Sequence, residues 1–244
     1  MMKADLCILV ATHKSYCMPE EDEYLPVQVG SAGKPDLGYQ RDDTGENISS
    51  RNANFCELTG LYWAWKNLSC QYCGLVHYRR IFKVEVSEIR RLLHEVDVLV
   101  PVPRRYFIET NYSQYVHAHH AQDLDVTREI LSERHADYLA AYDACMRRTY
   151  GHRFNMFVMR KDLMDDYCQW LFDVLFELER RLDISSYDPY SARVFGFVSE
   201  RLLDVWLTTR GIAFRELPVA NLESQNWPMK VIRFLMRKFI SGRR

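Results

Sequence analysis

One stretch of sequence constrains the fold most, because a helical pattern runs directly into a short apolar segment that ends in cations. Between residues 47 and 67, apolar side chains recur at three- and four-residue spacing, which predicts one amphipathic helix with Ser49 or Ser50 as its N-cap. The following run, Tyr72–Tyr78, is too short and too rich in β-forming residues for a helix, so it predicts a buried strand. A helix that feeds a buried strand is typical of an α/β protein.

Similar patterns continue along the chain. Apolar runs predict further strands at Leu6–Ala11, Tyr24–Gly30 and Val96–Val102, and periodic segments predict helices at Ser87–Leu93, Val126–Arg148, Leu163–Leu182 and from Ser191 onward. The chain has 244 residues, a length common for single α/β domains. We therefore expect an α/β fold with a mixed, mostly parallel sheet flanked by helices and a helical C-terminal part. Residues 1–222 would form one domain, and residues 223–244 a basic amphipathic tail.

Polar side chains lie at the ends of two of the predicted strands. Thr12-His13-Lys14 follows the run Leu6–Ala11, and His77, Arg79 and Arg80 come at or directly after the run Tyr72–Tyr78. Ligands of open α/β sheets bind beyond the carboxyl ends of the strands, and two guanidiniums suit a diphosphate. The alternatives are surface arginines bridging to carboxylates, and a His13 that only supports a loop.

The order of several motifs resembles a bacterial family of capsular polysaccharide and exopolysaccharide glycosyltransferases, long catalogued as a domain of unknown function. The motifs are VATHK at residues 10–14, NIS at 47–49 with Asn52, CELTGLYWAWKN at 56–67, GLVHYRR at 74–80, NMF at 155–157 and RVFGFVSERL at 193–202. They keep the family's order and cover nearly the whole chain.

The resemblance implies a GT-A-like nucleotide-binding fold and sugar transfer from a nucleotide sugar, which in some relatives is thought to be UDP-galactofuranose. It implies that His77, Arg79 and Arg80 balance the charge of the leaving diphosphate. It also implies a group of donor-binding residues: Thr12, His13, Lys14, Asn47, Ser49, Asn52, Asn155 and Arg193. For Asn47, and for Asp42 and Asp43 before it, a simple Asx-type turn is the alternative to a grip on sugar hydroxyls.

Glu200 is the residue we expect to act as general base. Inverting transfer needs a carboxylate that takes the proton of the acceptor hydroxyl, and GT-A enzymes usually place it late in the domain, on or just before a helix. Asp188 and Glu57 are the competing carboxylates. Alternatively, Glu200 only pairs with Arg193 or Arg201 at helical spacing.

No cofactor beyond the donor is expected to be required, although Mn²⁺ or Mg²⁺ is the alternative. Asp123-Leu124-Asp125 matches the short DxD pattern and follows three histidines, His117, His119 and His120. We instead expect Asp125 and Thr127 to cap the helix that begins near Val126. The CxxC motif at Cys70–Cys73 lacks the further ligands of a zinc site.

Charge and composition limit the kinds of partner that the chain can bind. A formal net charge of −1 gives no global attraction to nucleic acid, and no apolar run reaches the roughly 20 residues that cross a bilayer. Seven cysteines without a signal peptide favour a cytoplasmic protein. The basic, apolar stretch at residues 227–244 predicts peripheral contact with the inner membrane face, where a glycan or undecaprenyl-linked acceptor would lie.

Without the family resemblance, the residues also allow two other functions. The first is a non-catalytic module that binds sugar nucleotides or polysaccharides, with Tyr62, Trp63 and Trp65 stacked on sugars. The second is a metal-dependent hydrolase built on the cluster from His117 to Asp125. The sequence leaves open the sugar, the linkage, inversion or retention, and the number of subunits.

Overall fold

The structure is a computed structural model that describes residues 4–222. Its strands are β1 (Ala4–Thr12), β2 (Tyr24–Gln28), β3 (Gln40–Arg41), β4 (Cys70–His77), β5 (Arg80–Phe82), β6 (Val98–Pro101), β7 (Arg104–Arg105), β8 (Tyr150–Gly151), β9 (Phe157–Arg160), β10 (Phe214–Leu217) and β11 (Val219–Asn221). Its α-helices are α1 (Asn52–Phe55), α2 (Leu58–Asn67), α3 (Val86–Leu93), α4 (Asn111–Val116), α5 (Ala121–Arg134), α6 (Ala136–Arg147), α7 (Lys161–Arg181) and α8 (Val194–Arg210). Short 3₁₀ turns at Ser49–Arg51 and Ser191–Arg193 precede α1 and α8.

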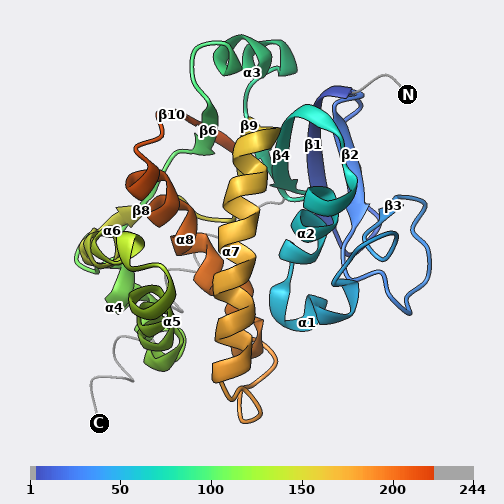
Figure 1. Cartoon of the computed structure of the whole chain (residues 1–244). Helices are drawn as coiled ribbons and strands as arrows, with labels where there is room; N and C mark the ends of the chain where they lie inside the picture. The colour runs from blue at the N-terminus through green and yellow to red at the C-terminus, as the bar shows by residue number, and fades with distance from the viewer. Residues whose placement is uncertain (1–3, 223–244) are drawn as a thin grey trace.

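The main sheet has the strand order β10-β6-β9-β4-β1-β2-β3 (Figure 1). The pairs β1–β2, β1–β4, β2–β3 and β6–β10 are parallel, whereas β9 runs antiparallel to both β4 and β6. At one edge of β4, β5 and β11 extend the sheet with antiparallel pairing. The predicted mixed, mostly parallel sheet flanked by helices is therefore confirmed, with the GT-A-like α/β arrangement that the resemblance implied.

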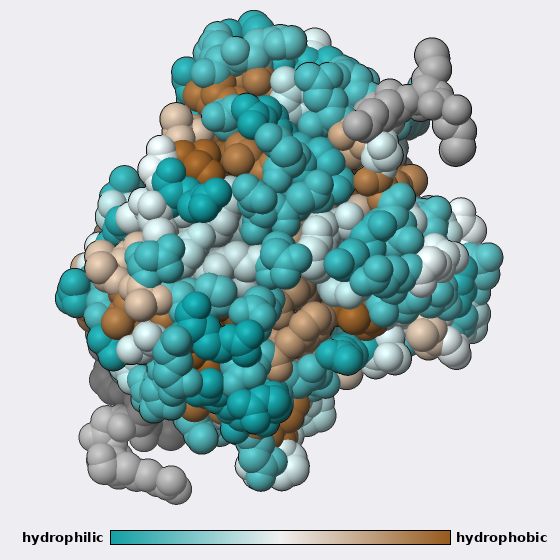
Figure 2. All heavy atoms as spheres, in the orientation of Figure 1, coloured by the Kyte–Doolittle hydropathy of each residue, from teal (hydrophilic) through white to brown (hydrophobic). Residues whose placement is uncertain are grey.

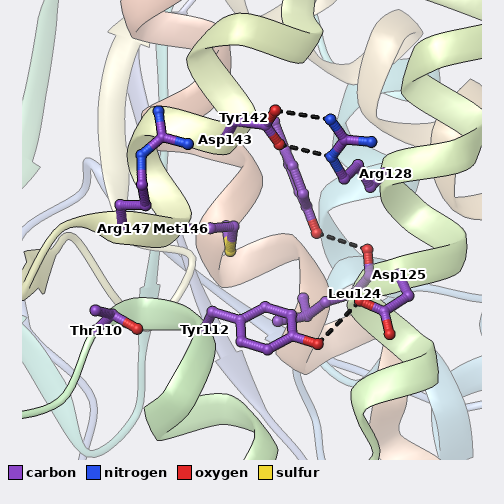
Figure 3. Close-up of a pocket in the computed structure, with 9 residues that line it drawn as sticks. All are labelled: Thr110, Tyr112, Leu124, Asp125, Arg128, Tyr142, Asp143, Met146 and Arg147. Atoms are coloured by element: carbon purple, nitrogen blue, oxygen red, sulfur yellow. Dashed lines mark hydrogen bonds and ion pairs between the residues drawn. The ribbon is translucent and has the colours of Figure 1, made fainter.

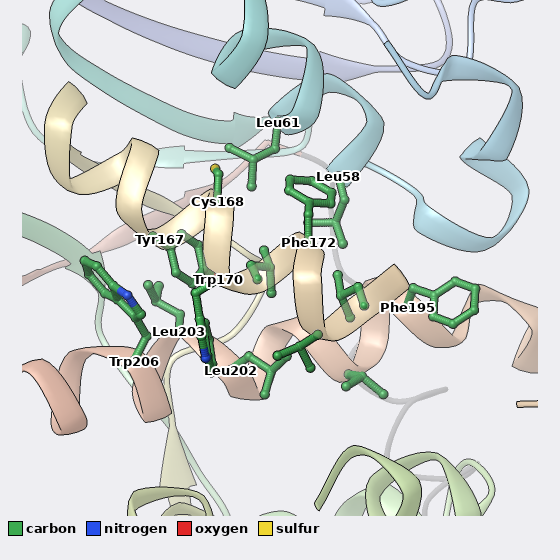
Figure 4. Packing of buried hydrophobic residues seen from close by; sticks show 14 of the residues in the cluster. Leu58, Leu61, Tyr167, Cys168, Trp170, Phe172, Phe195, Leu202, Leu203 and Trp206 are labelled. Atoms are coloured by element: carbon green, nitrogen blue, oxygen red, sulfur yellow. The ribbon is translucent and has the colours of Figure 1, made fainter. Parts of the chain in front are cut away.

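The sheet separates two hydrophobic cores, because alternate residues of each strand face opposite sides. On β1, Leu9 and Ala11 face the larger core, while Ile8 and Val10 face the smaller one beneath α3. In the larger core, α2, α7 and α8 pack against one another (Figure 4). The labelled side chains are Leu58 and Leu61 of α2, Tyr167, Cys168, Trp170 and Phe172 of α7, and Phe195, Leu202, Leu203 and Trp206 of α8. The outer face along α7 is mostly hydrophilic, with hydrophobic patches below α3 and beside α7 (Figure 2).

The predicted first helix is interrupted. The segment divides into α1 and α2, and neither Ser49 nor Ser50 acts as a side-chain N-cap. Cys56 causes the interruption with φ 53°, a conformation that L-residues other than Asn and Asp rarely adopt. The apolar periodicity continues through this break, because both helices pack the same side against the core. The expectation of one capped helix was therefore wrong.

The predicted helix from Val126 to Arg148 is also two helices, α5 and α6, which meet at His135. Because α5 begins at Ala121, Asp125 and Thr127 lie inside it and cap nothing. The hydroxyl of Thr127 instead donates to the carbonyl of Asp123 at 2.6 Å, as threonines in helix interiors commonly do. The predicted cap at this position was wrong.

The aromatic residues of α2 belong to the core. The ring of Trp65 stacks on Phe172 at a centroid distance of 5.7 Å, and the ammonium of Lys66 lies 3.6 Å from its centroid. Trp63 is buried, and Tyr62 packs edge-on against Phe172 at 5.0 Å. These rings therefore support α7 and are not arranged as a platform for sugars.

Residues 4–222 contain no helix that is long and apolar enough to span a bilayer. All seven cysteines are free thiols, and Cys70 and Cys73 are both buried. The stretch from 227 to 244, for which membrane contact was predicted, lies outside the described residues.

Candidate active site at the rim of the sheet

The parallel strands β1 and β4 end at the same edge of the sheet, which we call the rim. β1 ends at Thr12 and β4 at His77, and Ala11 lies opposite His77 in the register. The buried hydroxyl of Thr12 donates to the carbonyl of Lys14 at 2.6 Å and accepts from its amide at 3.2 Å. This local pairing turns the chain away from the sheet and exposes His13 and Lys14 beside the end of β4.

The buried ring of Tyr78 gathers the cationic groups of the rim. His13 meets it edge-on at 5.4 Å, and the charged groups of Lys14 and Arg79 lie 5.0 Å and 5.2 Å from its centroid. Partial burial lowers the pKa of His13, and Arg79, Lys14, Lys34 and Arg193 lower it further. Burial and the neighbouring cations therefore both disfavour the charged form of His13, and the cations make this end of the sheet electropositive.

Arg80 is the half-buried member of this group. Its guanidinium lies 4.3 Å from the ring centroid of Phe154, and its buried Nε has no hydrogen-bond partner within residues 4–222. Burial and then Arg79 lower the pKa of Arg80, while Glu200 and Glu57 oppose that shift. A buried donor without a hydrogen-bond acceptor lowers the stability of the folded state, so an anionic ligand at this point would supply the missing acceptor.

His77 connects the rim to the chain before β9. Its Nε2 lies 2.5 Å from the carbonyl oxygen of Phe154, so this nitrogen donates the hydrogen bond. Phe154 and the following Asn155 both have positive φ, 75° and 53°. His77 thus fixes a strained turn of the backbone, and its Nδ1 is the ring nitrogen left for another contact.

Three strained backbone positions meet at the rim. Cys56, Phe154 and Asn155 are the only non-glycine residues with positive φ in the described part of the chain. They are brought together although 98 residues separate them in sequence, because Asn155 Nδ2 donates to Glu57 Oε1 at 2.7 Å. Such conformations persist only where surrounding contacts enforce them, and they concentrate at functional sites.

Asn155 braces the site from its centre. Besides its bond to Glu57, its Nδ2 lies 3.2 Å from the carbonyl oxygen of Gly196, and its Oδ1 accepts from the hydroxyl of Ser199 at 2.9 Å. Gly196 allows the start of α8 to lie close to Cys56, because a Cβ at this position would lie only 3.1 Å from Cys56 Sγ. The buried amide therefore ties the break between α1 and α2 to the first turns of α8.

The helix α8 brings Arg193 and Glu200 to the same place. Arg193 Nε donates to Cys56 Sγ at 3.1 Å, and its guanidinium lies 5.2 Å from the ring centroid of Phe197. Partial burial disfavours its charge, but Cys56 and Glu57 outweigh that effect and raise the pKa of Arg193. Glu200 retains a side-chain exposure of 20%, so its carboxylate remains reachable beside Arg80.

Glu200 forms an ion pair with Arg201 at 3.5 Å, one of the two pairings that its helical spacing predicted. The guanidinium of Arg201 also donates to the carbonyl of Phe197 at 2.7 Å and to Gln114 Oε1 at 2.9 Å, so Arg201 is shared among three acceptors. The alternative pairing with Arg193 is not formed, because Arg193 donates to Cys56. Glu57, which sequence reasoning named only as a competitor, is the second carboxylate at the rim.

Asn47, Ser49 and Asn52 lie further back, around the buried carboxylate of Asp42. Ser49 donates to Asp42 at 2.5 Å, and Asn47 forms a local turn by accepting from the amide of Ser49 at 3.2 Å. Asn52 Nδ2 donates to the carbonyl of Cys56 at 2.7 Å. These side chains thus hold the helix break in place, and their contact with a donor stays a prediction.

The cluster from His117 to Asp125 does not converge on one point. Asp123 accepts from the hydroxyls of Tyr115 and Tyr187, each at 2.7 Å, whereas Asp125 accepts from Tyr112 at 3.0 Å. His119 packs between aromatic rings, 4.3 Å from that of Phe197. Within the part of the chain that is described, no three metal-ligating side chains come together.

A separate hollow of about 300 Å³ lies between α4, α5 and α6, away from the rim (Figure 3). Its walls are already paired internally, as the dashed lines in Figure 3 show. Arg128 bonds Asp143 at 2.7 Å and 2.8 Å, and the hydroxyl of Tyr142 donates to the carbonyl of Leu124 at 2.8 Å. Four buried side-chain nitrogens in residues 4–222 have no hydrogen-bond partner, and none of them lines this hollow, whereas that of Arg80 lies at the rim. We therefore place the candidate site at the rim.

The fold has a solved counterpart. A structure described as the WbbM bifunctional glycosyltransferase in its apo form superposes with a TM-score of 0.84 and 27% sequence identity. The match covers 90% of this chain and 46% of that chain, so this chain spans less than half the length of the protein that it resembles. A search of curated proteins found no match. Residues 7–211 match the family described as Domain of unknown function (DUF4422), and the chain therefore belongs to that family.

Proposed function

We propose that this protein is a glycosyltransferase that moves a sugar from a nucleotide diphosphate donor to a glycan or lipid-linked acceptor in the synthesis of a surface polysaccharide. The similarity to a bifunctional glycosyltransferase over 90% of the chain supports transfer as the class of reaction. The observation that carries the proposal is the buried Nε of Arg80, which has no partner within residues 4–222, at a rim that also holds Arg79, His13 and Lys14. This site favours an anion such as a diphosphate.

In the proposed reaction, the oxygen of an acceptor hydroxyl attacks the anomeric carbon of the donor sugar. The bond from that carbon to the β-phosphate oxygen breaks, its electron pair stays on the leaving diphosphate, and Glu200 takes the hydroxyl proton. Arg79 and Arg80 stabilise the charge that develops on the diphosphate, with His77 holding the adjacent turn. The positions of Glu200 beside Arg80, and of both beside Glu57, support this assignment.

We further propose that the nucleoside lies over Thr12, His13 and Lys14, and that the donor is UDP-linked, with galactofuranose or galactose as the sugar. The motif resemblance supports this choice. Arg193 would contact the donor, whereas Asn155, Asn47, Ser49 and Asn52 would act by positioning, since their polar atoms bond to neighbouring protein groups. Thermal protection by a panel of nucleotide sugars would identify the donor, because a ligand of the native state raises its stability.

The decisive experiment measures UDP release on addition of acceptor. Replacing Arg80 by Ala should lower kcat by about 10²- to 10³-fold, as loss of a preorganised donor to a developing anion does. Replacing Arg79 by Ala should also reduce turnover. The exposed Arg91 on α3, whose guanidinium bonds Glu88 at 2.7 Å, is the matched control, and its replacement by Ala should have no effect. Full turnover in both rim variants would exclude the diphosphate assignment.

A further inference from the structure

The most exposed apolar side chains in residues 4–222 lie next to each other, in the loop between β7 and α4. Phe107 is fully exposed, and Ile108 is 74% exposed. Neither side chain contacts either of the two cores. Large apolar side chains that are held together in water mark a surface that meets another phase or molecule.

The loop is held at both ends, so the exposure of its tip is imposed by the fold. On the incoming side, β7 pairs with β8, the amide of Tyr106 donates to the carbonyl of Thr149 at 2.7 Å, and Arg153 Nε donates to the hydroxyl of Tyr106 at 3.2 Å. On the outgoing side, Thr110 forms a capping box at the start of α4. Phe107 and Ile108 therefore project from a fixed stem.

Cations surround the stem without acidic partners. Arg105 and Arg148 place their guanidiniums 5.3 Å and 5.9 Å from the ring centroid of the exposed Tyr150, and Arg104 lies 5.6 Å from that of Tyr106. Within residues 4–222, none of these three guanidiniums forms an ion pair. The acid of the loop, Glu109, lies 2.5 Å from His117. The surface is thus cationic around an apolar tip.

We propose that this loop docks the protein onto an anionic lipid bilayer, with Phe107 and Ile108 entering the interface and Arg104, Arg105 and Arg148 contacting the headgroups. Charge complementarity selects this occupant, because arginines that flank apolar and aromatic side chains are the composition of segments that lie at membrane interfaces. β6, which leads into this loop, and β4 both run antiparallel to β9, so their carboxyl ends lie at the same edge of the sheet and docking would hold the candidate site near the bilayer. Only this last consequence rests on the proposed function.

Sedimentation of the full chain with vesicles tests the proposal. The wild-type protein should bind vesicles that contain phosphatidylglycerol and bind vesicles of phosphatidylcholine alone far more weakly. The double variant Phe107→Ser with Ile108→Ser should lose roughly tenfold or more of its partition coefficient. The double variant Arg104→Gln with Arg105→Gln should lose about fivefold for each guanidinium removed, with the loss confined to anionic vesicles.

The matched control removes an exposed aromatic residue and a cation elsewhere on the surface. Phe214 on β10 is 40% exposed and is followed by Arg215, so Phe214→Ser with Arg215→Gln should bind like the wild type. Binding of the loop variants at the wild-type level, or no binding of the wild type, would overturn the proposal. So would loop-dependent self-association in light scattering without vesicles, because the occupant would then be a second copy.

The same variants separate this proposal from the proposed reaction. Phe107→Ser with Ile108→Ser should keep the wild-type rate of UDP release with a water-soluble acceptor, because neither side chain is among the residues to which the proposed reaction assigns a role. A rate that falls together with vesicle binding would mean that the loop serves the site directly and would count against docking as its role.

Discussion

At the scale of single residues, two carboxylates lie beside Arg80 and differ in what they contact. Glu57 accepts from Asn155 at 2.7 Å, so one of its oxygens is engaged in bracing the break between α1 and α2. Glu200 is 20% exposed, and it pairs with Arg201 at 3.5 Å. This difference supports the proposal that Glu200 is the proton acceptor, and it favours a positioning role for Glu57.

Replacing each carboxylate by its amide tests that assignment. Glu200→Gln should lower kcat by at least about 100-fold with a smaller effect on KM, because an amide cannot take the proton of the acceptor. Glu57→Gln should be milder, since its amide oxygen still accepts the bond from Asn155. Steady-state kinetics of both variants would reveal the reverse order if Glu57 were the base.

His119 should make stability depend on pH. Burial lowers its pKa from 6.5 to about 4, so the unfolded chain binds a proton between these values and the folded chain does not. The free energy of unfolding should therefore fall as the pH drops below about 6.5. In His119→Phe, which keeps a ring between Tyr115 and Phe197, this fall should be smaller.

Urea denaturation between about pH 7 and pH 5 would measure the effect. The exposed His94 provides the control, and its replacement by Phe should leave the dependence on pH unchanged. An identical decline in His119→Phe and in the wild type would show that other groups are responsible.

At the scale of elements, the longer apolar strands and most helical segments could be predicted from the sequence, whereas the short strands β3, β5, β7, β8, β10 and β11 could not. β1, β2, β4 and β6 are short apolar runs, and α3 and α7 carry a clear periodic stripe, so local pattern and tertiary structure agree there. His77, Arg79 and Arg80 were predicted at the rim for the same reason, because they come at or directly after a recognisable strand. Their role in binding stays a prediction.

The break at Cys56 could not be predicted, because it depends on contacts from distant segments. Asn52 holds the carbonyl of Cys56, and Asp42 accepts from the hydroxyls of Ser49 and Thr59 at 2.5 Å and 2.6 Å. The contact between Asn155 and Glu57 spans 98 residues and has no local signal at all. Sequence reasoning therefore named Asn155, Asn52 and Glu57 but not the long-range contacts by which they hold the site together.

Asp42 should be the more important of two adjacent carboxylates. It is fully buried and accepts from the amides of Gly30 and Ser31 at 2.8 Å and 3.0 Å, in addition to its hydroxyl partners. Asp42→Ala should therefore reduce the free energy of unfolding by about 3 kcal/mol, since several buried donors lose their acceptor. Chemical denaturation monitored by circular dichroism would measure this loss.

Asp43 is the matched control for that measurement. It pairs with Arg41 at 2.7 Å near the surface, and such solvent-screened pairs contribute little to stability. Equal losses in Asp43→Ala and Asp42→Ala would contradict the view that the Asp42 network holds the break between α1 and α2.

At the scale of the whole molecule, charge is distributed unevenly. The formal net charge of the chain is −1, yet the cations Lys14, Arg79 and Arg80 gather at one end of the sheet. A local concentration of guanidiniums can balance the charge of a leaving diphosphate, the task that a divalent cation performs in many transferases.

We therefore expect sugar transfer to continue in a chelator. UDP release should be unchanged after dialysis against EDTA, and added Mn²⁺ or Mg²⁺ should not increase it. A loss of turnover that either ion restores would contradict this prediction and would require metal ligands at the rim.

The direction of β9 determines whether the segment before it or the segment after it lies at the candidate site. Strands that run with their neighbours contribute the residues that come after them, as β1 and β4 do. β9 runs the opposite way, so Phe154 and Asn155, which precede it, reach the edge, while the start of α7 is carried to the far end. In a sheet with one reversed strand, ligand-contacting side chains should be sought upstream of that strand.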